Sequence, residues 1–191
     1  MSKIEWKPGT MIYPLPAVMV TCGDMENSNI ITIGWTGIVN TNPAMTYISV
    51  RKERFSHSII KENMEFVINL TTKDLVRATD YCGVKSGRDI DKFKETGLTK
   101  EKANHVKCPL IKESPVNIEC KVVEIKELGS HDMFLAKILA VNIDDKYLDE
   151  NETFDMQKCG LMAYSHGKYY ELGKQIGKFG YSVAKKKKKR K

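Results

Sequence analysis

The sequence of 191 residues lacks several patterns that mark common protein classes. Its N-terminus, "MSKIEWKPG", has no hydrophobic run, so no secretory signal is predicted. Its five cysteines are widely spaced and include no CxxC pair. This spacing argues against a disulfide framework or a zinc site and predicts reduced thiols. We therefore expect a cytoplasmic protein with no membrane span and no bound metal.

The body of the chain also lacks an excess of charge. The formal net charge is +7, but the last seven residues, "KKKKKRK", are all basic. Removing these seven from the 31 Lys and Arg leaves 24, which equals the 24 Asp and Glu. We expect one domain over residues 1–181 and a basic, disordered tail over 182–191. A neutral body argues against nucleic-acid binding, although a module that binds nucleic acid through the tail stays as an alternative.

No Gly-rich phosphate loop and no Ser-His-Asp or Cys-His arrangement is evident, so no nucleophilic catalytic residue is predicted. Short runs rich in β-branched and aromatic residues are present instead, separated by Asn, Gly and Pro. The predicted strands are 17–23, 29–35, 45–50, 65–70, 116–128, 133–144 and 168–172. The predicted helices are 56–63, with Ser56 as N-cap, 72–80, and 91–97, with Gly97 as C-cap. These elements predict a mainly β fold, an antiparallel Greek-key barrel with a few short peripheral helices.

The stretch "SVRKERFSHSII", residues 49–60, gathers charge where a predicted strand gives way to a predicted helix. Three cations, Arg51, Lys52 and Arg54, are followed by Ser56 and Ser58. A helix N-terminus with hydroxyls and cations nearby favours a phosphate group. The alternative is an ordinary capped surface helix after a charged turn.

The preceding stretch, "NIITIGWTGIVNTNP", offers a second set of binding groups. Asn29, Trp35 and Thr36 lie around two glycines, Gly34 and Gly37. Glycines beside a strand often mark close approach to a ligand, and an indole with polar neighbours suits a flat heteroaromatic ring. The alternative is a core tryptophan with a turn-forming asparagine.

Five segments in order resemble the flavin reductase-like family, whose members have an FMN-binding split barrel, and flavoredoxins in particular. They are "NIITIGWTGIVNTNP", "YISVRKERFSHSIIKENMEFVINL", "CGVKSGRDIDKF", "GSHDMFLAKI" and "YSHGKYYELGKQIGKFG". The resemblance covers nearly the whole chain before the lysine tail. It implies that the barrel is a split barrel, with residues 1–181 as the FMN-binding domain.

The resemblance also implies a set of FMN-binding residues. The phosphate would be held by Arg51, Arg54 and Ser56, and the ring and ribityl chain by Asn29, Trp35 and Thr36, with backbone contacts from Ser49 and Val50. Asn69 and Leu70 match a stretch that approaches the flavin. Lys92 and His131 match positions that reach the ring or its tail, from the same chain or from a second subunit. Either would raise the flavin potential if it placed a cation or an oriented N–H near the flavin N1. Tyr164 falls where relatives often place an aromatic residue.

The function implied by the resemblance is an FMN-dependent oxidoreductase. NADH or NADPH, or a redox protein partner, would supply electrons that bound FMN passes to a flavin or another acceptor. The flavin, rather than a protein side chain, would carry the chemistry. A homodimer is implied as well. The alternatives are a non-enzymatic FMN-binding electron carrier and a redox sensor.

Overall fold

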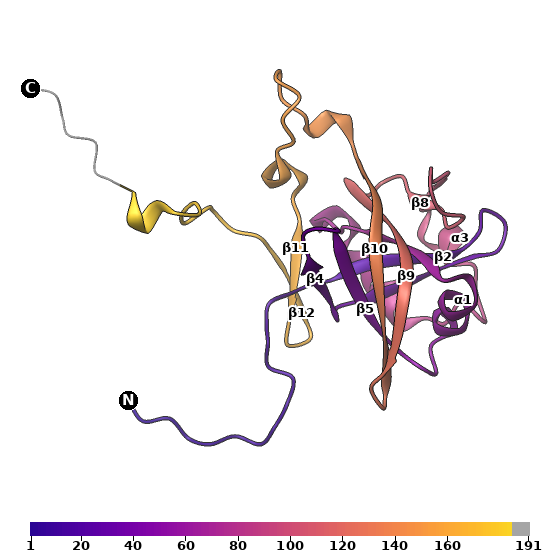
Figure 1. The fold of residues 1–191 in the computed structure, drawn as a ribbon, viewed down its shortest axis with the longest axis horizontal. Helices are drawn as coiled ribbons and strands as arrows, with labels where there is room; N and C mark the ends of the chain where they lie inside the picture. Colours follow the sequence, from indigo (N-terminus) through magenta and orange to yellow (C-terminus); the bar gives the residue numbers. More distant parts are fainter. Residues whose placement is uncertain (185–191) are drawn as a thin grey trace, which may run out of the picture.

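The computed structural model describes residues 1–184, and its main element is a seven-stranded antiparallel sheet. The order of strands across this sheet is β3-β2-β6-β9-β10-β5-β4 (Figure 1). In chain order the strands are β2 (Val18–Gly23), β3 (Ser28–Ile33), β4 (Thr36–Asn40), β5 (Met45–Arg51), β6 (Glu65–Asn69), β9 (Val116–Glu127) and β10 (His131–Ile143).

The sheet closes into a barrel because its two edge strands are neighbours in the chain. β3 and β4 lie at opposite edges of the sheet, yet only Gly34 and Trp35 separate them. The two edges must therefore meet at these residues, but β3 and β4 do not pair with each other, so the barrel is split there. We call this junction of Gly34 and Trp35 the seam. The backbone N–H of Ser49 on β5 donates to the carbonyl of Trp35 at 2.9 Å and fixes the seam against the sheet.

Alternating side chains of the strands fill separate hydrophobic clusters, the two largest on opposite faces of β2. Val18 and Val20 of β2 pack inside the barrel with Phe66 and Phe134, whereas Met19 packs on the opposite face. This is the period of two expected for a strand that is buried on both faces. Helix α1 (Phe55–Asn63) contributes Ile60 to the barrel interior.

Helices α2 (Val76–Val84) and α3 (Lys92–Thr96) cover the outer face of β2 and β3. A 3₁₀ turn, η1 (Lys73–Leu75), precedes α2. The other 3₁₀ turns are η2 (Asp145–Tyr147), η3 (Met156–Cys159) and η4 (Tyr181–Val183).

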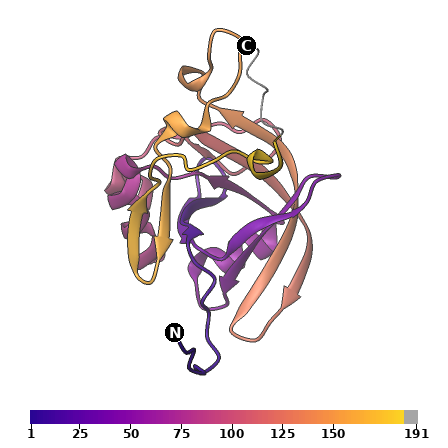
Figure 2. The same ribbon diagram turned by 90° about the vertical axis from the view of Figure 1, so that its left-hand side faces the viewer.

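A small sheet of three strands lies beside the barrel, in the order β1-β11-β12. It consists of β1 (Leu15–Pro16), β11 (Met162–Ser165) and β12 (Lys168–Glu171). Figure 2 shows the β11–β12 hairpin on one side of the molecule and the long β9–β10 pair on the other. A further pair, β7 (Lys100–Glu101) with β8 (Leu110–Ile111), covers part of β6.

The mainly β split-barrel fold and the long β9–β10 hairpin are confirmed. Helix 72–80 is the turn η1 followed by α2, which continues to Val84, and Gly97 is the left-handed C-cap of α3. Ser56 is not an N-cap, because α1 begins one residue earlier with Arg54 at the cap position. The strands β1, β4, β7, β8 and β11 were not predicted, because they are short, and β1 also depends on a partner far away in sequence, β11.

All five cysteines are free and buried. No helix within residues 1–184 has both the length and the hydrophobicity to cross a bilayer. Both terminal segments run away from the barrel (Figure 1). The predicted tail, residues 182–191, falls mostly on residues 185–191, which lie outside the described residues.

Candidate functional site

The larger of two adjoining cavities lies at the seam and has a volume of about 400 Å³. The barrel contributes Trp35 and the residues at the end of β5, and helix α2 contributes Gly83 and Val84. The small sheet and the segment before it close the far side with Tyr13, Tyr164 and Tyr169, among others. The cavity is thus bounded by elements from the beginning, the middle and the end of the domain.

Trp35 and His131 meet at the wall formed by the barrel. Their ring centroids are 5.4 Å apart in an edge-on arrangement, and the indole is 40 % exposed. Burial, followed by the positive charge of Arg51, lowers the pKa of His131. The imidazole is therefore neutral at pH 7 and has one N–H to donate. A neutral donor beside an exposed indole suits a flat ligand with polar edges.

The smaller cavity, of about 190 Å³, adjoins the larger one, and both are lined by Ile31, Arg54 and Val84. Four cationic side chains line it, Arg54, Lys85, Arg88 and Lys92, against one acidic side chain, Glu53. The first turn of α1 also lines it, through Phe55 and Ser56. A cavity of this size with four cations is suited to a phosphate group.

Two helix ends converge on the smaller cavity. The N-cap of α1, Arg54, makes no side-chain capping bond, so the first N–H groups of this nine-residue helix have no capping acceptor. At the other side, the C-terminal carbonyls of α2 hold cations in place. Arg54 donates to the carbonyl of Gly83 at 2.6 Å, and Lys92 donates to that of Cys82 at 2.7 Å. The C-terminal partial charge of α2 thereby orients both cations.

Lys92 is a buried cation, with only 3 % of its surface exposed. Its ammonium donates to the carbonyls of Ile30 and Cys82, both at 2.7 Å. Within the described residues it has no carboxylate partner. Burial, assisted by the charge of Arg54, lowers the pKa of Lys92 to about 8. An ammonium has three donors, so one N–H remains for an anion in the cavity that Lys92 lines.

The floor of the smaller cavity depends on close contact between Asn29 and Gly87. The amide of Asn29 donates to the hydroxyl of Ser56 at 2.7 Å. A Cβ at Gly87 would lie 2.1 Å from the side-chain oxygen of Asn29, which is a severe clash. An added side chain at Gly87 would therefore displace the amide of Asn29 from its place beside Ser56.

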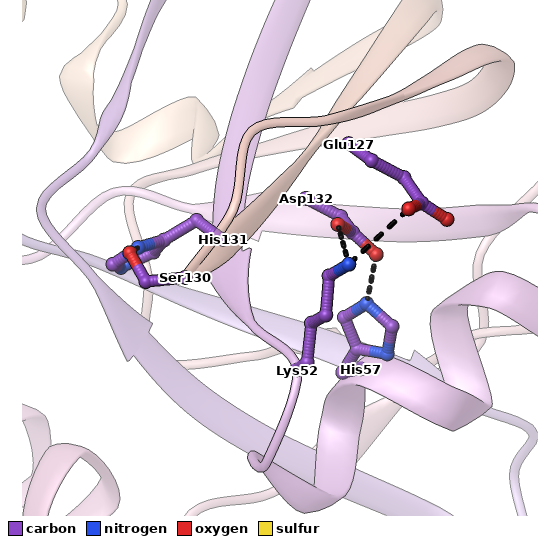
Figure 3. Close-up of polar contacts among 6 residues, drawn as sticks. All are labelled: Lys52, His57, Glu127, Ser130, His131 and Asp132. Carbon is purple, nitrogen blue, oxygen red and sulfur yellow. Dashed lines mark hydrogen bonds and ion pairs between the residues drawn. The ribbon is translucent and has the colours of Figure 1, made fainter.

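A charged network supports the strand end that carries His131 (Figure 3). The buried carboxylate of Asp132 contacts Nε2 of His57 at 2.8 Å and pairs with Lys52 at 3.3 Å. Lys52 also pairs with Glu127 at 3.3 Å. Burial opposes ionisation of Asp132, but His57 and Lys52 outweigh it and hold the pKa of Asp132 below its usual value. His131 points away from this network (Figure 3) and toward the larger cavity.

The structure brings ten of the thirteen predicted site residues to the two cavities. The larger is lined by Trp35, Ser49, Val50, Arg51, His131 and Tyr164, the smaller by Asn29, Ser56 and Lys92, and Arg54 lines both.

Thr36, Asn69 and Leu70 line neither cavity. The hydroxyl of Thr36 donates to the carbonyl of Tyr47 at 2.6 Å, and Leu70 packs against the barrel interior. Asn69 is fully buried and donates to the carbonyl of Met19 while accepting from the N–H of Ile111. These contacts give Asn69 a structural position that joins β6, β2 and β8.

Several lining residues were missed by the sequence analysis. Lys85 and Arg88 lie in "KSGR", which has the same combination of cations, serine and glycine as the stretch around Arg54. That shared composition could have marked Lys85 and Arg88 as candidates for the same phosphate site. Tyr13, Asp80 and Tyr169 gave none, because tertiary pairing alone brings them to the larger cavity.

An antiparallel barrel whose edge strands meet without pairing, with a cavity at this seam and a basic pocket beside it, defines a split-barrel protein. The chain belongs to the flavin reductase-like family: the family model described as "Flavin reductase like domain" matches residues 10–173. This membership makes it a flavin-related oxidoreductase.

Two solved structures and one sequence relative illustrate the likeness. Flavoredoxin of Desulfovibrio vulgaris is 29% identical with a TM-score of 0.87, over 96% of this chain and 100% of that one. Flavoredoxin from Methanosarcina acetivorans is also 29% identical, with a TM-score of 0.85 and the same coverage. An uncharacterized protein of Archaeoglobus fulgidus is 33% identical over 83% of this chain and 88% of its own length.

Proposed function

We propose that the protein binds FMN and moves electrons through it, from NADH, NADPH or a redox protein partner to a flavin or another acceptor. The observation that carries this proposal is the pair of adjoining cavities, which have different chemistry. One is lined by the exposed indole of Trp35 and by His131, and the other is lined by four cations and a helix N-terminus. A planar ring joined to a phosphate by a flexible chain matches this division.

The residues present fit FMN. The buried ammonium of Lys92 has no carboxylate partner among the described residues, which suits a site that receives a phosphate dianion. Arg54, Arg88, Lys85 and the first turn of α1 would hold the same group. Bound FMN would supply reversible two-electron redox chemistry.

Lys92 and His131 have separate roles in this proposal. Lys92 lines the smaller cavity and His131 the larger one, so we assign Lys92 to the phosphate and His131 to the ring. Trp35, Ser49, Val50, Arg51 and Tyr164 would also surround the ring system, and Asn29 and Ser56 the phosphate. Thr36, Asn69 and Leu70 are left out, because their side chains are engaged elsewhere.

The visible absorption spectrum of the purified protein tests this function. We expect flavin bands at nearly one FMN per chain, and bleaching when NADH or NADPH is added without oxygen. Bleaching by dithionite alone would favour an electron carrier that needs a partner protein, an alternative supported by the 29% identity to two flavoredoxins. A chain that neither contains FMN nor takes it up would refute the proposal.

A homodimer in the cytoplasm completes the proposal. Large apolar side chains are exposed on both terminal segments, among them Trp6, Ile12, Ile176 and Phe179, and a second copy would cover such residues. Five free thiols suit a reducing compartment. Light scattering after size exclusion tests the dimer. Nucleic-acid binding through residues 185–191 stays an untested alternative, and full activity without these residues would remove it.

Gly87→Ala is expected to weaken FMN binding about tenfold or more. The added methyl group would collide with the side chain of Asn29 and move it, or the segment 85–88, out of place. Fluorescence titration of the apoprotein with FMN measures the effect. Gly173→Ala is the matched control, because a Cβ there meets nothing within 4 Å. Equal affinity of the two variants would show that this close contact does not shape the phosphate site.

A further inference from the structure

The amine of Lys92 is held in a fixed direction by two backbone carbonyls. Its Nζ donates to the carbonyl of Ile30 on β3 and to that of Cys82 on α2, both at 2.7 Å. The side-chain carbon and these two hydrogen bonds take three of the four tetrahedral positions around the nitrogen. The fourth position holds a third N–H in the ammonium and the lone pair in the neutral amine. Because Lys92 lines the smaller cavity, a ligand in that cavity can reach this fourth position.

The surroundings of Lys92 favour the neutral amine. Only 3 % of its surface is exposed, and no carboxylate of residues 1–184 pairs with it. Burial, assisted by the charge of Arg54, lowers the pKa of Lys92 from 10.5 to about 8. At pH 7 the neutral amine is therefore roughly 300-fold more abundant at Lys92 than at an ordinary exposed lysine.

Two thiols lie close to the same amine, and neither carries a charge. Cys22 on β2 and Cys82 on α2 are fully buried. Burial raises the pKa of both thiols to about 11, so they stay protonated at pH 7. A protonated thiol neither pairs with an ammonium nor acts as a strong nucleophile. The amine of Lys92 is therefore the buried nucleophile of the smaller cavity.

The smaller cavity also supplies anchors for an anion next to this amine. Three further cations line it, Arg54, Lys85 and Arg88. The acidic side chain of the lining, Glu53, pairs with Arg51 at 3.4 Å, outside this set of cations. A desolvated lysine beside other cations is an arrangement that activates an amine as a nucleophile. A ligand that carries both an anion and an electrophilic carbon can thus use the anchors and the amine together.

We propose that Lys92 of the FMN-free chain forms a Schiff base with small phosphorylated aldehydes. The amine lone pair attacks the aldehyde carbon, a C=N bond forms, and the aldehyde oxygen leaves as water with the two amine protons. The phosphate lies among the other three cations. The protonated imine keeps the positive charge and one N–H, so one of the two carbonyls retains its donor. This site goes beyond the proposed function, and only its competition with FMN rests on that function.

Two aldehydes that differ only in the phosphate group test the site. The full-length chain, freed of FMN, is incubated with glycolaldehyde phosphate or with glycolaldehyde, and cyanoborohydride reduces each imine to a stable secondary amine. Peptide mass mapping identifies the labelled lysines. We expect Lys92 to be labelled first, and at least about tenfold faster by glycolaldehyde phosphate, because the cations bind its phosphate. The rate at Lys92 should level off above about pH 8, whereas exposed lysines continue to gain reactivity.

Variants and FMN assign the label to this cavity. Lys92→Arg keeps the charge but has no primary amine, so the label should be lost. Arg88→Gln removes one exposed cation of the lining and should lower the preference for the phosphorylated aldehyde severalfold. Lys94→Met removes an exposed lysine of the same helix and should leave the labelling of Lys92 unchanged. Excess FMN should protect Lys92, since its phosphate occupies the same cations.

Label confined to exposed lysines, equal rates of the two aldehydes at Lys92, or labelling of Lys92 that bound FMN does not slow would overturn the proposal. A chain that takes up no FMN but is labelled at Lys92 with the preference for phosphate would refute the proposed function and leave the aldehyde site standing. The two failures are therefore distinguishable.

Discussion

Lys92→Met is expected to weaken FMN binding at pH 7 by roughly a hundredfold. A hydrogen bond between a buried ammonium and a charged acceptor contributes about 1.5–3 kcal/mol, and each 1.4 kcal/mol is about a tenfold change in affinity. Methionine has a similar length but no donor and no charge. The carbonyls of Ile30 and Cys82 hold the ammonium in place before any ligand arrives. The side chain therefore loses little conformational entropy when FMN binds, and nearly the whole hydrogen-bond energy contributes to affinity. Fluorescence titration of the apoprotein with FMN gives the two dissociation constants.

The same residue predicts the pH dependence of FMN binding. The pKa of Lys92 is lowered to about 8, so above this pH the apoprotein holds a neutral amine. A phosphate favours the charged form, so binding above about pH 8 must take up a proton, and affinity falls by up to about tenfold per pH unit. We expect this fall in the unmodified protein and its absence in Lys92→Met.

Lys94→Met is the matched control, because Lys94 lies on the same helix but is exposed and lines neither cavity. It should bind FMN with the affinity of the unmodified protein. If both lysine variants retain that affinity, the phosphate does not contact Lys92, and the assignment of the smaller cavity fails.

Asp132→Asn is expected to lower the free energy of unfolding by about 3 kcal/mol, since breaking a buried charge pair leaves its partners uncompensated. Asp132 is 1 % exposed and contacts both His57 and Lys52. For a chain of this length such a loss corresponds to roughly 10 °C in Tm. Because the pKa of Asp132 is lowered in the folded state, its contribution is present above about pH 4 and is lost as the pH falls through the folded-state value.

Glu127→Gln tests the outer end of the same network. Glu127 and Lys52 are both exposed, and exposed ion pairs contribute about 0–1 kcal/mol. We expect thermal and urea unfolding to show a small change for Glu127→Gln and a large one for Asp132→Asn. Equal effects would mean that the burial of Asp132 does not determine how much its ion pairs contribute to the free energy of unfolding.

The local sequence predicted the parts of the site that lie within one segment. The cations after β5, the start of α1 and the seam tryptophan are close together in the chain, and composition there favours a phosphate and a flat ring, with a capped surface helix and a core tryptophan as the alternatives. Asn69 could not be assigned in this way, because a buried asparagine serves a ligand or the backbone equally well. The structure shows backbone partners for Asn69, the carbonyl of Met19 and the N–H of Ile111, which lie 50 and 42 residues away in sequence.

The tyrosine side of the larger cavity shows more clearly what local sequence does not predict. Tyr13 and Tyr164 come together because β1 pairs with β11, with Leu15 opposite Tyr164. Both strands are shorter than five residues, and no periodic pattern marks such short elements. The contact of Asp80 with Tyr169 spans 89 residues. A sequence pattern that is read locally does not predict pairings of this range.

The seam between β3 and β4 also determines when the site can form during synthesis. The first residues of the cavity emerge early, but the two edges of the sheet are joined through β5, β10, β9, β6 and β2. The strand order therefore delays barrel closure until β10, which ends at Ile143, has left the ribosome, and the wall of tyrosines waits for Tyr169. Contacts between such distant segments form slowly. Newly made chains should thus acquire their flavin only after nearly complete translation. Cofactor binding would then follow folding of the barrel rather than direct it.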